Sequence, residues 1–131
     1  MKEKLKQFMK ALHEKDIIFS SDDFRDVIPL SNDTFLYADP PYSITSATYT
    51  ENSSWGTKDD TDLFEYLDKC HENGIKFALS NVAQHKGTVN EELLKWAQKY
   101  NIHYLDFNYN NSNYQSTAKS KITHEVLITN Y

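Results

Sequence analysis

Residues 34–38, TFLYA, form an apolar run that ends abruptly in Asp39, Pro40, Pro41 and Tyr42. The run has no polar alternation, which favours a strand buried on both faces, as in a parallel sheet. Each proline fixes φ at about −65° and donates no backbone hydrogen bond, so the strand has to end at Asp39. In open α/β sheets, ligands bind beyond the carboxyl ends of the strands. The motif therefore places a rigid polar turn where an α/β protein builds its site.

Apolar periodicity and turn residues predict the other elements. We expect helices at 3–15, 60–73 and 90–100, strands at 17–19, 75–80, 102–107 and 124–130, and loops at 43–58, 81–89 and 108–121. Asp59, Asp60 or Thr61 is the expected N-cap of the second helix, and Gly74 its C-terminal stop. The pattern predicts an α/β fold with helices on the faces of a mostly parallel sheet. The last two strands, joined without a helix, should form an antiparallel hairpin.

Length and composition limit the class of protein. A chain of 131 residues suffices for one domain with its own core, so we expect residues 1–131 to form a single domain. One cysteine excludes an intrachain disulfide, and no apolar run reaches membrane-spanning length or the form of a signal peptide. These features predict a cytoplasmic protein with no membrane partner. The net charge is −5, and the acidic residues concentrate before residue 75, so a polyanion should contact the C-terminal part.

The Asp-Pro-Pro-Tyr turn suits one kind of ligand. The carbonyls of Asp39 and Pro40 are held out as rigid acceptors, and Tyr42 adds a flat ring beside them. A carboxylate, a carbonyl and a ring together match a planar heterocycle that carries an NH₂ group. The competing interpretation is a plain turn, because Asp-Pro-Pro often ends a strand.

The turn, DPPY at 39–42, resembles the catalytic motif of amino-group methyltransferases that use S-adenosylmethionine. The stretches IIFSSDDF (17–24), FALSN (77–81), NYNNSNYQ (108–115) and KITHEVLITNY (121–131) are similar to parts of the Dam-like DNA adenine methyltransferases. The resemblance covers nearly the whole chain and implies a partial Rossmann-like methyltransferase fold. It also implies methyl transfer to N6 of an adenine flipped out of double-stranded DNA, in a cytoplasmic DNA-methylation or restriction–modification system.

The resemblance assigns roles to particular residues. Asp39, Pro40, Pro41 and Tyr42 would be catalytic, while Asp23 and Phe24, with Asp39, would contact the cofactor. Asp22 competes with Asp23, and an N-cap-like acidic turn is the alternative for both. Tyr109 and Tyr114 are candidates to flank the flipped base, and Lys86, Lys119 and Lys121 to contact phosphates. Ser46, Tyr49 and Trp55 lie in the long loop that could close over the substrate. No metal is implied.

Parts of the family pattern have no counterpart here. The three glycines, Gly56, Gly74 and Gly87, do not form the family's F-x-G-x-G turn, and the strand with the ribose-binding acid and the target-recognition region are absent. We therefore expect the C-terminal part of a catalytic domain that needs a missing N-terminal half or another chain. The exposed edge of strand 34–38 would pair with strand 17–19 or with another chain, including a second copy as a homodimer.

Two other functions remain open at this stage. A non-catalytic remnant or subunit would associate with a partner chain or with DNA, and the absent glycine-rich turn favours it. A methyltransferase acting on an RNA base or a protein glutamine would share the chemistry. Such relatives more often have Asn in place of the first Asp of the motif and lack the EVLITNY ending found here.

Overall fold

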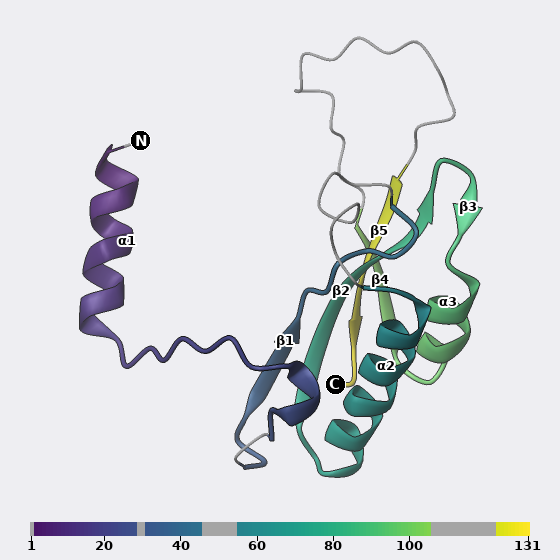
Figure 1. Ribbon diagram of the computed structural model, residues 1–131, viewed down its shortest axis with the longest axis horizontal. Helices are drawn as coiled ribbons and strands as arrows, with labels where there is room; N and C mark the ends of the chain where they lie inside the picture. The colour runs from purple at the N-terminus through teal and green to yellow at the C-terminus, as the bar shows by residue number, and fades with distance from the viewer. Residues whose placement is uncertain (1, 29–30, 46–54, 106–122) are drawn as a thin grey trace, which may run out of the picture.

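The computed structural model describes residues 2–28, 31–45, 55–105 and 123–131 (Figure 1). In chain order the elements are α1 (Lys2–Glu14), the 3₁₀ turn η1 (Phe24–Asp26), β1 (Phe35–Ala38), α2 (Thr57–Glu72), β2 (Lys76–His85), β3 (Thr88–Val89), α3 (Glu91–Ala97), β4 (Asn101–Leu105) and β5 (Thr123–Thr129). The predicted α/β class is confirmed. No helix of the described residues is long and apolar enough to cross a membrane.

The strands form one sheet in the order β1-β2-β5-β4, with the short β3 paired to β2. β1 and β2 run parallel, with Leu36 opposite Phe77 and Ala38 opposite Leu79. β5 lies antiparallel between β2 and β4, so β1, β2 and β4 share one direction. The sheet is therefore mixed: β1 with β2 is its parallel pair among the described strands, and its C-terminal antiparallel pair, β4 with β5, is as predicted.

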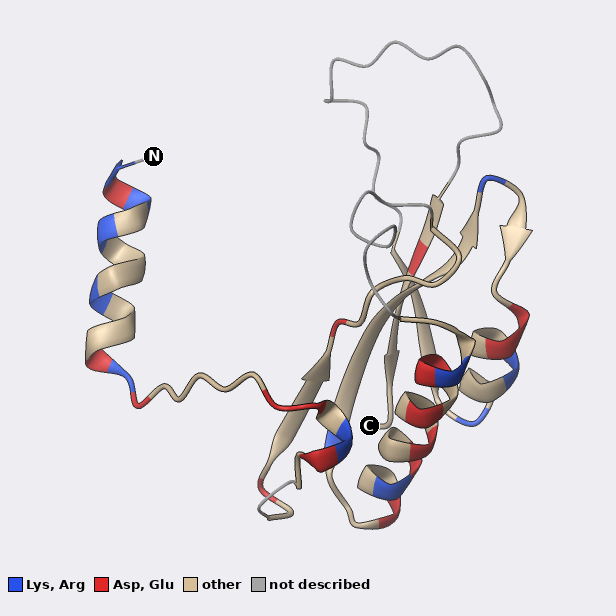
Figure 2. Cartoon of the chain, in the orientation of Figure 1, with Lys and Arg blue, Asp and Glu red and all other residues tan. Residues whose placement is uncertain are grey.

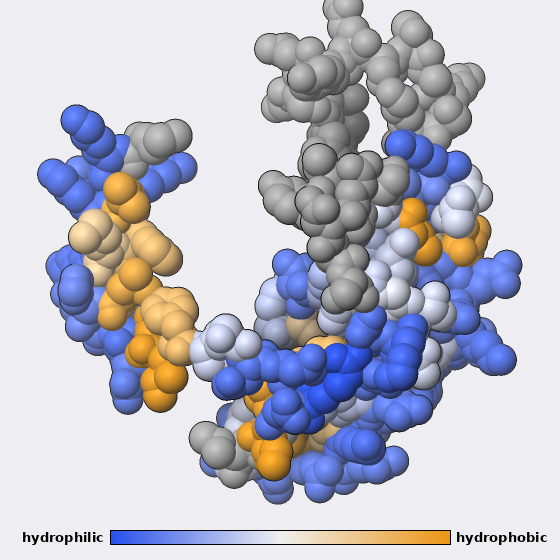
Figure 3. Space-filling view, viewed as in Figure 1, coloured by the Kyte–Doolittle hydropathy of each residue, from blue (hydrophilic) through white to orange (hydrophobic). Residues whose placement is uncertain are grey.

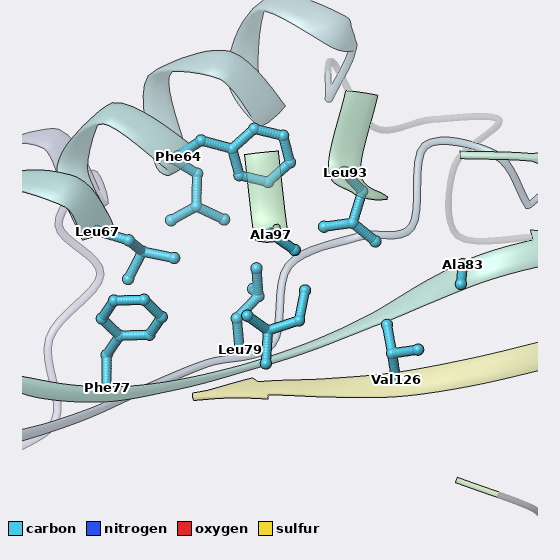
Figure 4. Close-up of a cluster of buried hydrophobic side chains, with 10 residues drawn as sticks. Phe64, Leu67, Phe77, Leu79, Ala83, Leu93, Ala97 and Val126 are labelled. Atoms are coloured by element: carbon cyan, nitrogen blue, oxygen red, sulfur yellow. The ribbon is translucent and has the colours of Figure 1, made fainter. Parts of the chain in front are cut away.

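The core lies between the sheet and the two helices α2 and α3, which cover the same face (Figure 4). Its residues come from both helices and the two central strands: Leu63, Phe64, Leu67, Phe77, Leu79, Ala83, Leu93, Ala97, Val126 and Ile128. The expectation of helices on the faces of the sheet is thus met on one face by α2 and α3. α1 stands away from the sheet (Figure 1), and its apolar stripe, which includes Leu5, Phe8 and Met9, is exposed (Figure 3).

The predicted strand at 17–19 is wrong. These residues have no regular structure, and the side chains of Ile18 and Phe19 are 89% and 78% exposed. A strand needs a neighbour for its backbone hydrogen bonds, and none of the described strands lies beside this segment. β1 pairs only with β2 among the described residues, so the expected pairing of 17–19 with 34–38 is also not found.

The predicted loop at 81–89 is also wrong, because β2 continues to His85 and turns back into β3. The two turn residues, Lys86 and Gly87, have φ of 48° and 86°. Two consecutive positive φ values characterise the tight hairpin turn that matches the twist of the strands. Glycine adopts this conformation without strain, whereas lysine rarely does. Only one of the two turn residues is therefore of a type that predicts this hairpin turn.

The two predicted helices that cover the sheet are both present, but their ends differ from the predicted ones. α2 starts at Thr57 after the N-cap Gly56, and the carboxylate of Asp59 accepts the Gly56 N–H at 2.8 Å. The predicted caps Asp59, Asp60 and Thr61 are therefore inside the helix. Gly74, with φ of 74°, ends the turn after α2 as predicted. α3 is capped by Asn90, whose side chain accepts the Leu93 N–H, and stops at Ala97 rather than at residue 100.

A side chain completes the sheet at the start of β2. Asn130 accepts the Phe77 N–H at 2.7 Å and donates to the Ile75 carbonyl at 2.8 Å, as a neighbouring strand would. Its amide also contacts Nδ1 of His71 at 3.2 Å. The residue after β5 is thereby joined to the turn between α2 and β2.

Asp68 joins α2 to α3. Its carboxylate accepts hydrogen bonds from Trp96 Nε1 at 2.9 Å, Lys99 Nζ at 2.6 Å and the Tyr100 hydroxyl at 2.7 Å. Burial acts to raise the pKa of Asp68, but the three donors outweigh it and hold that pKa below its usual value. The folded state therefore favours the ionised carboxylate.

We predict that Asp68→Ala lowers the free energy of unfolding at pH 7 by ~1–3 kcal/mol, because partly buried donors lose their acceptor. A group whose folded pKa is lowered stabilises the protein above its unfolded pKa, and loses that effect as pH falls through the folded pKa. The difference between wild type and variant should therefore shrink below about pH 4. Urea denaturation between pH 7 and pH 2 measures it, with Glu65→Ala on the exposed side of α2 as control. An unchanged difference at pH 2 would contradict the ionic origin.

Candidate functional site

Asp39 directly follows the carboxyl end of β1, and its side chain is exposed. Its Oδ1 atom accepts a hydrogen bond from Ser80 Oγ at 2.7 Å and another from the Tyr42 hydroxyl at 3.1 Å. Within the described part of the chain, Oδ2 has no hydrogen-bond partner. One carboxylate oxygen is thus fixed by the protein, and no described residue binds the other.

Ser80 comes from β2, the parallel neighbour of β1. Because Ala38 is opposite Leu79, the next residue of each strand, Asp39 and Ser80, reaches the same edge of the sheet. The Tyr37 hydroxyl donates to Ser80 Oγ at 3.2 Å, which completes a chain of hydroxyls leading to Asp39. The sequence prediction missed Ser80, although its place at the end of FALS, beside a parallel strand, was a usable signal.

Tyr42 is half-buried, and the turn that carries it is closed by a bond from Thr45 N–H to the Tyr42 carbonyl at 3.1 Å. Burial raises the pKa of the Tyr42 hydroxyl, and the negative charge of Asp39 raises it further, against a lowering contact from Ser80. The hydroxyl therefore stays protonated and donates to Asp39 at neutral pH. The ring is held at both ends, by its backbone turn and by its hydroxyl.

Asp23 caps the η1 turn. Its Oδ1 accepts the Arg25 N–H at 2.9 Å, and the Arg25 guanidinium binds the same carboxylate at 3.0 Å. The backbone N–H and then the side chain of Arg25 lower the pKa of Asp23. Arg25 also binds Asp59 and Asp62 of α2, so η1 is tied to the first turns of that helix (Figure 2). This geometry matches the alternative interpretation of an acidic N-cap, and a cofactor role for Asp23 stays a prediction.

One cavity joins the two predicted groups of residues. It has a volume of about 480 Å³ and is lined by Asp22, Asp23 and Phe24 on one side and Asp39, Pro40 and Pro41 on the other. Tyr42 does not line it. Two other cavities, of about 520 Å³ each, lie between η1 and α2 and between α2 and α3. Neither contains a residue of the 39–42 motif, so the smaller cavity is the candidate site despite its size.

Aromatic side chains form one wall of this cavity. Phe24 packs against Trp55, with ring centroids 5.7 Å apart, and edge-on against Tyr66 at 5.9 Å. The Tyr66 hydroxyl donates to the Val27 carbonyl at 2.9 Å, and burial raises the pKa of Tyr66 to about 12. Trp55 was expected in a loop that could close over the substrate, without a role in the cofactor cavity. Tyr66 was not expected, because the period of α2 does not distinguish a cavity-lining aromatic from a core one.

The other predicted residues are less well placed by the structure. Lys86 is exposed in the β2–β3 turn, beyond the same ends of the strands as Asp39. Tyr109, Tyr114, Lys119 and Lys121 lie outside the described residues, as do Ser46 and Tyr49. Within 2–28, 31–45, 55–105 and 123–131, no three His, Cys, Asp or Glu side chains are grouped to hold a metal ion.

The sequence is similar to known proteins along its whole length. A family model for the D12 class N6 adenine-specific DNA methyltransferases matches residues 1–117. The chain is 41% identical over 137 residues to the type II methyltransferase M.FokI of Planomicrobium okeanokoites, and 41% identical over 139 residues to the modification methylase StsI of Streptococcus sanguinis. It is 31% identical over 134 residues to the modification methylase LlaI of Lactococcus lactis subsp. lactis.

These matches cover 99–100% of this chain but only 20–21% of each relative, so the chain spans about a fifth of their length. The family model includes the cavity, the 39–42 motif and both helices that cover the sheet. The chain belongs to the family of D12 class N6 adenine-specific DNA methyltransferases.

Proposed function

We propose that this chain supplies the acceptor-binding part of a site that transfers a methyl group from S-adenosylmethionine to N6 of an adenine in double-stranded DNA. The observation that carries the proposal is the cavity that joins the η1 turn to Asp39, Pro40 and Pro41. The family match supports adenine in DNA over an RNA base or a protein glutamine as the acceptor.

The 39–42 turn has the polarity that an adenine NH₂ group needs. Asp39 Oδ2 and the Pro40 carbonyl accept no hydrogen bond from the described residues, so both are available for the two amine hydrogens. Accepting both orients the nitrogen lone pair and stabilises the positive charge that develops there. Flipping the base costs a few kcal/mol, and stacking on the anchored Tyr42 ring would return ~1–3 kcal/mol.

The cavity fits the adenine end of the cofactor. Its walls combine the Phe24 and Trp55 rings with carboxylates at the rim. Asp22 is exposed and has no hydrogen-bond partner among the described residues, whereas Asp23 is occupied by Arg25. Asp22 is therefore the freer acceptor for an adenine amine. When bound, S-adenosylmethionine supplies the electrophilic methyl group.

The site needs more chain than the structure contains. We infer that residues 1–131 are the C-terminal part of a catalytic domain whose glycine-rich turn and DNA-reading region are supplied by another segment or chain. We place this protein in the cytoplasm. The exposed apolar stripe of α1, the exposed Ile18 and Phe19, and the open edge of β1 support an association role. A non-catalytic subunit that docks through these surfaces is the second candidate function. Lys86, Lys119 and Lys121 are the proposed phosphate contacts.

We predict weak binding of S-adenosylmethionine to the isolated chain, because the turn that holds the methionine part is absent from it. Isothermal titration calorimetry measures the affinity directly. A one-to-one isotherm with a micromolar dissociation constant would contradict the incomplete site.

We predict that adding a segment with the F-x-G-x-G turn from a relative restores methylation of adenine-containing duplex DNA. Asp39→Ala should then lower the rate by ~10²-fold or more, because the acceptor of the amine hydrogens is lost. Transfer of a radiolabelled methyl group measures the rate. Asp33→Ala, exposed in the turn before β1, is the matched control. Equal rates for Asp39→Ala and Asp33→Ala would refute the assigned role.

We predict that the chain without a partner self-associates through the β1 edge and the exposed residues Ile18 and Phe19, forming a homodimer. Phe35→Lys with Ile18→Lys should shift it to monomer, since charge on an edge strand opposes pairing. Sedimentation velocity over a range of concentrations measures the mass. Val89→Lys, which adds one positive charge to the exposed β3, should leave the association unchanged. A monomer at all concentrations would exclude this contact.

A further inference from the structure

The two tryptophans occupy matched positions with different surroundings. Each donates its indole N–H to an aspartate of α2 at 2.9 Å, Trp55 to Asp60 and Trp96 to Asp68. Trp96 is stacked on Phe64, with ring centroids 4.5 Å apart and planes 12° apart, and belongs to the packing between the helices. Trp55 also packs against the core, but in addition it lines the candidate cavity. The same bond therefore serves packing in one case and faces an open space in the other.

Burial of the Asp60 carboxylate costs free energy that its contacts with the described residues offset only in part. It is 6% exposed, and Trp55 is the only side chain that donates to it within the described residues. By contrast, Asp68 has three donors. A buried carboxylate with one neutral donor is poorly compensated, although its place in the first turns of α2 helps through the helix dipole. What the contact does achieve is to fix the Trp55 ring at the cavity wall.

The aromatic rings that line the cavity differ in how much of each ring face is open to a ligand. The Arg25 guanidinium lies over the Phe24 ring, 4.5 Å from its centroid, and Trp55 and Tyr66 also pack against that ring. Phe24, which the sequence assigned to the cofactor, is therefore largely surrounded by protein. Trp55 contacts Phe24 at a plane angle of 47°, so the two rings are tilted rather than stacked. A tilted contact leaves much of the indole face uncovered by Phe24.

We propose that Trp55 is the surface on which the adenine ring of the cofactor stacks, and that Asp60 is the positioning residue that holds it. The inference rests on the proposed function of the cavity. It assigns the aromatic contact to a residue outside both sequence motifs. Replacing a stacking aromatic by alanine weakens binding of a base by about tenfold or more.

Adenosine tests this on the full 131-residue chain, because it carries only the part of the cofactor that Trp55 would contact. Saturation-transfer NMR measures how much adenosine is bound without relying on tryptophan fluorescence. Fluorescence of Trp96→Phe, in which Trp55 is the sole tryptophan, should change on titration with adenosine. Fluorescence of Trp55→Phe, which retains Trp96, should not change. Trp55→Ala should bind about tenfold more weakly than wild type.

Variants of Asp60 separate positioning from general stability. Asp60→Asn retains an oxygen that accepts the indole N–H and should retain affinity. Asp60→Leu removes it and should weaken adenosine binding, with a loss of the ordered Trp55 signal in near-ultraviolet circular dichroism. Thermal unfolding of each variant shows that it folds. If an alanine or leucine variant does not fold, the emission of the two phenylalanine variants decides the question.

The outcomes distinguish this inference from the proposed function. Adenosine that binds with unchanged Trp55 emission and with equal affinity for wild type and Trp55→Ala would overturn the stacking role and leave the cavity as an adenine site. No adenosine occupancy up to the solubility limit, in the wild-type chain and also in the chain completed with the F-x-G-x-G segment, would overturn the cofactor assignment of the cavity itself.

Discussion

The parallel pairing of β1 with β2 is the constraint on which the site depends. Its register puts Ala38 opposite Leu79, and both strands then deliver a polar residue to one edge of the sheet. Ser80 can bind Asp39 only in that register, because a shift by one residue would move every side chain of β1 to the opposite face. The burial of Leu36 and Ala38 against the helix layer opposes such a shift. Core packing therefore sets the orientation of a carboxylate that is itself exposed.

α2 connects the parts of the site through its acidic residues. Asp59 and Asp62 hold Arg25 and so the η1 turn, Asp60 holds Trp55, and Asp68 holds α3. In the sequence, the acids of this helix contribute to the acidic part of the chain before residue 75, and only Asp59 and Asp60 were given a structural role, as possible N-caps. In the structure, four of them instead bind specific donors from other segments. Arg25 keeps its charge in this setting, because the hydrogen bonds that it donates to Asp59 and Asp62 raise its pKa.

The sequence predicted those elements whose signals are local or depend on burial. The apolar run of β1, the periodicity of α2 and the glycine after it needed no knowledge of their neighbours. The strand at 17–19 failed because a strand depends on a partner, and apolar residues alone cannot supply one. The N-cap Gly56 was missed because its carboxylate partner, Asp59, sits inside the helix. Ser80 and Tyr66 join the site through contacts with segments distant in sequence, to Asp39 and Val27. Trp55 was placed in a loop near the substrate, but its contact with Phe24 depends on the folded position of η1.

The position of β5 has a consequence for biosynthesis. It is the last in chain order of the strands that the structure describes, yet it lies between β2 and β4 in the sheet. Until residues 123–129 have left the ribosome, β2 and β4 each lack the neighbour that joins them, and the nascent chain exposes two unfinished edges. Asn130, which closes the start of β2, follows later still. The sheet is thus completed at its centre only when β5 has been made, and until then the earlier strands present unpaired edges of the kind that favour aggregation.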